Sequence, residues 1–417
     1  MLEEKGYIYK GEYEGWYSIT DECFYTTQQV VKNAEGVYVS KETGSKVEWT
    51  KEYNYMFRLS AFKDALSLRY NDQKPVYPLQ YNSVVCQTLS EPVLADISIS
   101  RPRSRLTWGI QVPDDPEHTI YVWFDALLIY LSGAGFPKST VGWPADLQII
   151  GKDILRFHAI YLPAIILALS GPSFSQLAAK KPSQLLESPS PALPTRLLTH
   201  AHWTVSQAKM SKSVGNVVDP VQSMDKYGVD IVRFYLARVG GRFRDDVDWS
   251  FEQLEKHAKE LQSLLGNYLL RVNSARIIKS AKRPDIIPEK TIHPLNGELL
   301  DAALALPLLV KGKMESMEIA EALEAILEVL RLANKIVTDI APWAKETDAE
   351  VVWETRQVAL ATLRIAGVAL KPFLPETAER LLDALGLEQQ GKGWESVQEM
   401  RREDVWVERD VKGVKLF

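Results

Sequence analysis

The spacing of apolar residues changes along this chain and predicts two kinds of structure. In residues 1 to about 117, short β-rich runs alternate with turn signals, as expected of a compact α/β module. From about Phe251 onward, apolar residues recur three or four positions apart, beginning with Leu254, Ala258, Leu261 and Leu265. The pattern therefore predicts an α/β region followed by an all-helical region.

Two apolar strand candidates, each followed by an apolar helix, lie in the second part of the α/β region. The first runs from Thr119 to Phe124 and the second from Leu147 to Gly151. This order implies a parallel sheet that binds ligands at the carboxyl ends of its strands. Gly151 would let a ligand approach the backbone, and Asp153 could accept hydrogen bonds from ribose hydroxyls. Taken alone, Asp153 is better explained as a helix N-cap.

The helical region is expected to form an antiparallel bundle, because its connections are short. One amphipathic helix should stop before Pro342, and a further helix pair lies between Val351 and Ala384. Residues 171–196 contain five prolines among Ser, Gln and Lys, which predicts a disordered surface insertion between the two regions.

Composition describes a globular protein of several domains, with 417 residues, 46% of them hydrophobic and 25% charged. The net charge of −5 argues against indiscriminate nucleic-acid binding. Any RNA contact must come from a local patch, and residues 261–283 supply one. That segment holds five basic residues and no acidic residue.

The two cysteines, Cys23 and Cys86, are far apart and form no C-x-x-C pair, so neither a disulfide framework nor a zinc knuckle is expected. The most apolar run, Ile160–Leu169, is about half of the ~20 residues that cross a bilayer. The first residues have no signal or transit character. No membrane association is predicted.

The segment that carries the clearest chemistry is Lys209-Met210-Ser211-Lys212-Ser213. Two ammonium groups three residues apart, flanked by small hydroxylated residues, are suited to a mobile loop that neutralises the charge of a polyphosphate. A lone K-x-x-K would be better explained as a solvated surface loop. The whole pentapeptide, however, resembles the second signature of class I aminoacyl-tRNA synthetases, and its flanks resemble the methionyl enzymes.

This resemblance to methionyl-tRNA synthetases covers nearly the whole chain apart from 171–196. It includes Val47-Glu-Trp-Thr-Lys-Glu-Tyr-Asn-Tyr-Met-Phe-Arg-Leu-Ser and Ile97-Ser-Ile-Ser-Arg-Pro, which resemble the connective-peptide domain of that family. The implied divisions are a connective-peptide domain (1–117), the second half of a Rossmann-type catalytic domain (118–220), a stem-contact connection (221–250), an anticodon-binding helical bundle (251–390) and a C-terminal tail (391–417).

Many members of the family carry zinc-binding cysteine pairs in the connective domain. Here Ser18, Asp21 and Cys23 occupy that region, which implies the zinc-free type of some bacterial and organellar members and no structural zinc. We therefore expect a mitochondrial matrix enzyme, with the cytoplasm as the alternative. The resemblance implies methionine, methionine tRNA and ATP with Mg²⁺ as substrates and partners.

The resemblance also assigns roles to individual residues. Methionine would be bound by Trp123, Ala126, Tyr130 and His158. ATP would be bound by Gly151 and Asp153, with the catalytic lysines Lys209 and Lys212 on its phosphates. The anticodon would be read by Asn267, Arg271 and Trp343. Without the family, Trp123, Tyr130 and His158 would each be better explained as ordinary core residues, and Trp343 equally well.

One family motif is absent: none of the six histidines lies in a His-x-Gly-His pattern, the first class I signature. We expect that the first half of the nucleotide-binding sheet is not in this chain. The chain is then a truncated gene model, the product of an internal start, or one piece of a split enzyme whose other half is a separate chain. Two functions remain open. The chain is part of a methionine-tRNA ligase and is inactive alone, or it is a non-catalytic tRNA-binding module.

Overall fold

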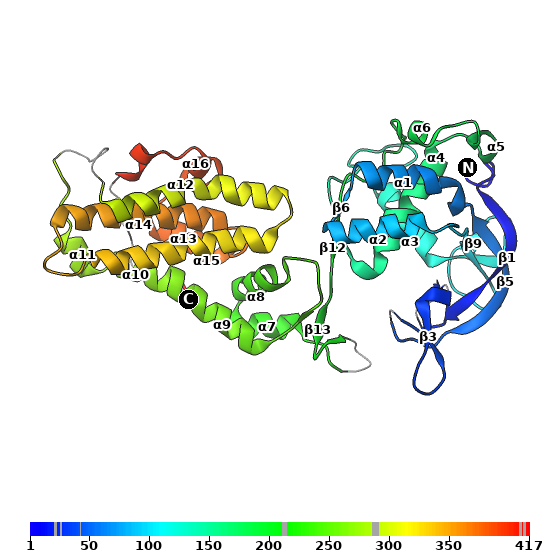
Figure 1. Ribbon diagram of the computed structural model, residues 1–417, viewed down its shortest axis with the longest axis horizontal. Helices are drawn as coiled ribbons and strands as arrows, with labels where there is room; N and C mark the ends of the chain where they lie inside the picture. The colour runs from blue at the N-terminus through cyan, green and yellow to red at the C-terminus, as the bar shows by residue number, and fades with distance from the viewer. Residues whose placement is uncertain are drawn as a thin grey trace. The chain divides into compact units, whose positions relative to one another are not determined.

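A computed structural model describes residues 1–20, 23–25, 27–41, 43–210, 215–285, 292–407, 411 and 414–417. The chain divides into two compact units, Met1–His200 and Ala201–Phe417 (Figure 1). The first unit is α/β and the second is mainly helical. The expected order of an α/β region followed by a helical bundle is confirmed.

Antiparallel strands make up the outer part of the first unit. The long pair β1 and β5 is aligned from Ile8 opposite Phe57 to Tyr17 opposite Glu48 and curves along one side of the unit in Figure 1. The strands of its sheet, in spatial order, are β2 (Cys23–Tyr25), β1 (Ile8–Ser18), β5 (Glu48–Phe57) and β7 (Ile97–Ser98). Two smaller sheets consist of β8 (Ser100–Pro102), β10 (Asp115–Ile120) and β9 (Gln111–Val112), and of β3 (Val30–Lys32) and β4 (Tyr38–Ser40).

The first unit also contains a three-stranded parallel sheet. Its order is β11 (Gln148–Gly151), β12 (Leu197–His200) and β6 (Val76–Tyr77), and Gly151 pairs with His200 at the carboxyl ends. The helices that belong to this unit are α1 (Lys63–Asp72), α2 (Leu79–Ser90), α3 (Val122–Gly133), α4 (Leu162–Ser170), α5 (Phe174–Leu177) and α6 (Pro182–Leu186). Buried side chains of α1 to α4 share one core with β6, β11 and β12.

The strand predicted from Thr119 to Phe124 is wrong in its second half and in its partners. β10 ends at Ile120, and Val122–Gly133 is helix α3. β10 pairs antiparallel with β8 and β9, so it is not a strand of the parallel sheet. The apolar run continues into a helix because Leu127 and Leu131, four residues apart, both fill the core. The second predicted strand, at 147–151, is confirmed as β11.

The expectation of disorder at 171–196 is also wrong. This segment forms the short helices α5 and α6, and Leu185 packs against the core of the unit. Its backbone carbonyls accept hydrogen bonds from buried donors: the Trp143 indole donates to Ala192 O at 2.7 Å, and the Arg69 guanidinium donates to Pro194 O. Prolines limit helix length here, but they leave the carbonyls free to anchor the chain.

The boundary expected at residue 117 does not separate two packed parts. β6, α1 and α2 precede that boundary, yet β6 pairs with β12 and both helices share the core of the parallel sheet. The range 118–220, expected to be one half of the catalytic domain, also spans both compact units, because the first unit ends at His200.

The second unit begins with a small sheet in the order β14 (Ala208–Lys209), β13 (Trp203–Val205) and β15 (Val247–Asp248). Its helices are α7 (Pro220–Tyr227), α8 (Val229–Tyr235), α9 (Phe251–Leu261), α10 (Tyr268–Val272), α11 (Ala275–Ser280), α12 (Pro294–Glu315), α13 (Ile319–Ile340), α14 (Ala349–Leu370), α15 (Pro375–Ala384) and α16 (Glu395–Gln398). Figure 1 shows α12, α13 and α14 side by side, as their mutual packing requires.

The bundle follows the predicted helix pattern closely. α13 buries its apolar stripe and ends at Ile340, where Ala341 adopts a left-handed conformation (φ 49°) before Pro342. α14 is buried around most of its circumference and lies against α12, α13 and α15. The predicted stop before Pro342 and the predicted helix pair between 351 and 384 are both confirmed.

One helical run, Lys152–Ser170, is long and apolar enough to cross a membrane. Within it, 61% of the most apolar window is buried inside the protein. That burial is typical of a core helix, and α4 accordingly contributes Leu162, Ile165 and Ile166 to the core of the first unit.

Candidate active site

Helix α3 places the three predicted pocket residues of its segment on one side. Trp123, Ala126 and Tyr130 are three and seven positions apart, which corresponds to one helix face. Leu127 and Leu131 are almost fully buried, with exposed fractions of 2% and 1%. These leucines lie on the adjacent side of the helix, so their burial in the core fixes the direction in which Trp123, Ala126 and Tyr130 point.

A π-helical turn presents the next two site residues. The segment η4 (Phe157–Tyr161) lies between β11 and α4 and contains His158. π-Helical turns are rare and often occur at functional sites. The Phe157 ring stacks on Trp123, with ring centroids 4.3 Å apart and an interplanar angle of 28°. Phe157 was missed by the sequence analysis, although its position directly before His158 was a usable signal.

Tyr130 and His158 form a direct pair across α3 and η4. The Tyr130 hydroxyl and His158 Nε2 are 2.9 Å apart, and His158 Nδ1 lies 2.9 Å from Ile154 O. A carbonyl can only accept, so Nδ1 carries the proton and Nε2 accepts from the Tyr130 hydroxyl. Burial lowers the pKa of His158 and raises the pKa of Tyr130. The pair is therefore held as a neutral imidazole and a neutral phenol.

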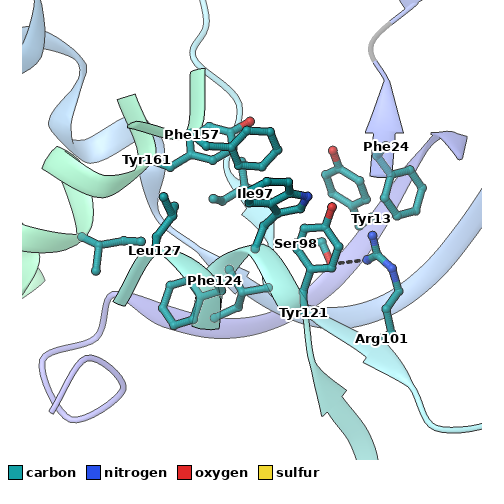
Figure 2. Close-up of a pocket in the computed structure, with 13 residues that line it drawn as sticks. Tyr13, Phe24, Ile97, Ser98, Arg101, Tyr121, Phe124, Leu127, Phe157 and Tyr161 are labelled. Atoms are coloured by element: carbon teal, nitrogen blue, oxygen red, sulfur yellow. Dashed lines mark hydrogen bonds between the residues drawn. The ribbon is translucent and has the colours of Figure 1, made fainter. Parts of the chain in front are cut away.

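An apolar cavity of about 60 Å³ lies beside this pair, lined by Trp123, Phe157, Leu127 and neighbouring aromatic rings. Figure 2 shows Phe157 and Tyr161 on one side of it and Tyr13, Phe24 and Arg101 on the other. Ala126, Tyr130 and His158 do not line this cavity. The structure thus brings Trp123 to the cavity and Tyr130 to His158, with α3 and η4 connecting the two groups.

Arg101 is a polar residue of this cavity that the sequence analysis did not assign. It is 3% exposed, and its Nη1 donates to Ser98 Oγ at 3.1 Å and to Ser100 O at 3.0 Å. The guanidinium also lies over the rings of Phe24 and Tyr121, at 4.6 and 4.7 Å from their centroids. Its Nη1 also lies 3.9 Å from Oε2 of the buried Glu52, so its charge already faces a carboxylate of the protein. The one available signal was an arginine directly after a short β-rich run.

The two predicted nucleotide contacts lie at the carboxyl end of β11. Gly151 is the last residue of the strand, and Asp153 lies in the 3₁₀ turn η3 (Lys152–Ile154) that follows. Gly151, and not Asp153, occupies the N-cap position of that turn. The simpler explanation of Asp153 as a helix N-cap is therefore wrong. Its exposed carboxylate lies at the sheet edge where ligands of parallel sheets bind.

The lysine segment belongs to the second unit. Lys209 ends β14, the second strand of a tight hairpin whose turn residues Ser206 and Gln207 both have positive φ (53° and 61°). Asp248 holds this turn: its carboxylate accepts from the Thr204 hydroxyl and from Gln207 N at 2.9 Å. Met210 follows Lys209, whereas Ser211, Lys212 and Ser213 lie outside the described residues.

Two of the predicted anticodon residues, Asn267 and Arg271, lie on consecutive helical segments of the second unit, and Trp343 lies in the turn after α13. The Arg271 guanidinium lies over the Trp343 ring, 5.7 Å from its centroid. Asn267 is exposed and precedes Arg271 by one helical turn. Arg271 is half-buried and bonded to α13, so it is more constrained than a surface arginine. The structure thus brings Arg271 and Trp343 together, and the role of all three residues in binding RNA stays a prediction.

Comparisons with known proteins agree with this fold. Residues 1–273 match the family model described as tRNA synthetases class I (M), and residues 295–405 match the model of the anticodon binding domain of methionyl tRNA ligase. The chain is 39% identical over 415 residues to the probable mitochondrial methionine–tRNA ligase of Neurospora crassa. It is also 39% identical over 417 residues to the mitochondrial methionine–tRNA ligase of Mus musculus.

Solved structures show the same likeness in three dimensions. The crystal structure of Mycobacterium tuberculosis methionyl-tRNA synthetase bound by methionyl-adenylate superposes with a TM-score of 0.79 at 34% identity, covering 95% of this chain and 75% of that one. The parallel sheet with its helices, joined to a helical bundle, is thus the architecture of a class I aminoacyl-tRNA synthetase. Within that class, the chain belongs to the methionyl-tRNA synthetase family.

The alignments also show how much of each relative's length this chain covers. The alignments cover 93% and 94% of this chain but 63% and 67% of the Neurospora crassa and Mus musculus proteins. The chain therefore spans about two thirds of the length of these relatives.

Because His158 is buried, we predict that acid lowers the stability of the folded protein. Its folded pKa is lowered by burial, so the unfolded chain takes up a proton at a higher pH than the folded chain does, and acid favours unfolding. Between pH ~7.5 and ~5.5, around the usual histidine pKa of ~6.5, the unfolding temperature should fall. In His158→Gln this fall should be shallower, as measured by thermal unfolding at each pH. Equal slopes for the two proteins would contradict the assignment of His158 as a buried neutral imidazole.

Proposed function

We propose that this chain supplies the methionine, ATP and tRNA contacts of a methionine-tRNA ligase, which activates methionine to methionyl-adenylate and transfers it to methionine tRNA. The observation that carries the proposal is the Trp123–Phe157 stack at an apolar cavity, next to the Tyr130–His158 pair. An unbranched thioether is polarizable and fits against aromatic faces. The Tyr130 hydroxyl and the His158 imidazole would place polar groups at the edge of that pocket.

In the first step, the methionine carboxylate attacks the α-phosphorus of ATP in line and pyrophosphate leaves. Gly151 lets the nucleotide approach the end of β11, and the Asp153 carboxylate accepts from the ribose hydroxyls. Lys209 and Lys212 neutralise the charge that develops on the departing pyrophosphate. Mg²⁺ would arrive with ATP, since it keeps several waters and binds mainly to phosphates.

Further parts of the proposal rest on the family. The chain is expected to bind no structural zinc, because Ser18, Asp21 and Cys23 stand where other members carry cysteine pairs; Asp21 and the Cys23 side chain lie outside the described residues. The mitochondrial matrix is the proposed location, with the cytoplasm as alternative, because the relatives named above are mitochondrial enzymes.

The second candidate function is a non-catalytic tRNA-binding module. It is favoured by the acid-free basic segment of residues 261–283 in the bundle. Both candidates share the anticodon contacts of Asn267, Arg271 and Trp343. They differ in whether methionine is activated.

Methionine-dependent exchange of pyrophosphate into ATP separates the two candidates. The chain alone should show no exchange, because loss of each transition-state contact commonly costs a factor of ~10²–10³. Adding the first half of the nucleotide fold from a relative, in the same chain or as a separate chain, should restore exchange. Reactions without methionine serve as the control. Exchange by the chain alone would contradict this prediction, and no exchange after the addition would favour the non-catalytic module.

Lys212 should act mainly on the transition state. In a protein that contains both halves of the nucleotide fold, Lys212→Ala should lower the rate of adenylate formation by a factor of about 10² or more and leave methionine binding almost unchanged. Single-turnover kinetics measures the rate, and equilibrium titration measures the affinity. Lys256→Ala, an exposed lysine of α9, is the control. Equal losses of rate and affinity would indicate a structural lysine.

Arg271 should contribute to the choice of anticodon. Arg271→Ala should reduce the preference for an RNA stem-loop with the methionine anticodon over one with a changed anticodon, by about 5- to 150-fold for a contact of ~1–3 kcal/mol. Fluorescence anisotropy of labelled RNA measures both affinities. Arg276→Ala, in the same basic segment, should weaken both complexes alike, since an exposed charge attracts any phosphate backbone. A preference that is unchanged in Arg271→Ala would refute the assignment.

A further inference from the structure

One residue, Asn334 of α13, makes most of the contacts that orient the Arg271 guanidinium, through both its backbone carbonyl and its side-chain amide. Arg271 Nη2 donates to Asn334 O at 3.0 Å and to Asn334 Oδ1 at 3.3 Å. Arg271 Nη1 lies 3.4 Å from Thr338 Oγ1, and the Thr338 hydroxyl itself donates to Asn334 O at 2.8 Å. One edge of the guanidinium is therefore fixed to a single residue of the neighbouring helix.

The other end of the same amide is tied to the helix that carries Asn267. Asn334 Nδ2 donates to Leu264 O at 3.0 Å and to Leu330 O at 2.9 Å. Leu264 lies in the π-helical turn η6 (Gln262–Asn267), which ends at Asn267. The wider hydrogen bonding of a π turn displaces its carbonyls from the normal helix ladder. The Leu264 carbonyl is accordingly satisfied by a side chain of another helix.

We propose that Asn334 is a positioning residue for anticodon recognition: it joins the π turn that ends at Asn267 to the guanidinium of Arg271 and fixes the two readers relative to each other. This inference rests on the proposed anticodon role of Asn267 and Arg271. Asn334 itself need not contact RNA.

The chemistry of the amide explains why asparagine suits this position. The contacts need an acceptor toward Arg271 and a donor toward two backbone carbonyls, and a short amide side chain supplies both groups. These bonds use both Nη2 protons and the contact with Thr338 uses one Nη1 proton, so the second Nη1 proton is the donor that can meet a ligand. An arginine reads a base edge through its fixed planar geometry, so its orientation determines which base fits.

The test uses the whole chain and the two RNA stem-loops described above. Asn334→Ala should lower the preference for the methionine anticodon about tenfold, as expected for a weakened base contact. In the Arg271→Ala background, adding Asn334→Ala should lower it no further, because Asn334 acts through Arg271. Two additive losses would overturn the proposal.

Two more variants separate positioning from a general structural role. Asn334→Asp keeps an acceptor for Arg271 but turns an oxygen toward Leu264 O and Leu330 O. It should therefore melt at a lower temperature yet keep most of the anticodon preference. Asn273→Ala is the matched control, because Asn273 accepts from a different arginine, Arg356, at 3.2 Å, and its loss should leave the preference unchanged.

The outcomes distinguish this inference from the proposed function. If the unmodified chain does not discriminate between the two stem-loops, the anticodon role fails and the inference fails with it. If Arg271→Ala loses discrimination while Asn334→Ala keeps it, only the inference is overturned. Loss of preference in Asn334→Asp to the same extent as in Asn334→Ala would also overturn it, because the acceptor toward Arg271 would then have no effect.

Discussion

Burial of one face of each site helix is the constraint on which the candidate sites depend. In α3, Leu127 and Leu131 are fixed in the core, and full burial of each such side chain is worth about 1.5–3 kcal/mol. Rotating the helix to turn Trp123 or Tyr130 elsewhere would expose both leucines. The same constraint acts on the π-helical turn η4, where Ala159 and Ile160 are buried beside His158. The directions of Trp123, Tyr130 and His158 are thus set by the packing of their neighbours in the core.

Within such anchored helices, π-helical turns adjust where the site residues point. One π turn in the first unit contains Phe157 and His158, and one in the second unit ends at Asn267. A π turn inserts one extra residue, so the residues on either side of it face differently from their places in a regular helix. The extra residue is tolerated where its polar groups find partners, as Leu264 O does with Asn334. Packing thus fixes the helix, and the π turn sets the angle of the site residue.

The sequence predicted the helical bundle well and the α/β region only in part. Helical spacing is a local feature of the sequence. The end of α13 before Pro342 could therefore be located from the apolar spacing and the position of that proline. The partners of β10 could not, because pairing with β8 and β9 instead of the parallel sheet depends on residues distant in sequence. The apolar run that continues into α3 illustrates the same difficulty, since short apolar runs fit a strand or a helix equally well. The order of the segment 171–196 depends on donors such as Trp143 and Arg69, which composition does not reveal.

The sequence motifs identified the side chains of the candidate sites, but not the neighbouring residues that hold those side chains in place. Trp123, Tyr130, His158, Asn267 and Arg271 were all proposed from the sequence, whereas Phe157, Arg101 and Asn334 emerged only from the contacts. The difference follows from the chemistry of each task. A lysine near phosphate acts as a point charge and tolerates an imprecise position. A segment such as Lys209-Met210-Ser211-Lys212-Ser213 can therefore be recognised from its residue pattern. A guanidinium that distinguishes bases must be held at a fixed angle, so its function depends on neighbours contributed by another helix. With a net charge of −5, attraction to RNA must come from a local basic segment, which acts on any phosphate backbone. Under the proposed function, discrimination among anticodons therefore has to come from the few side chains that the fold holds rigidly.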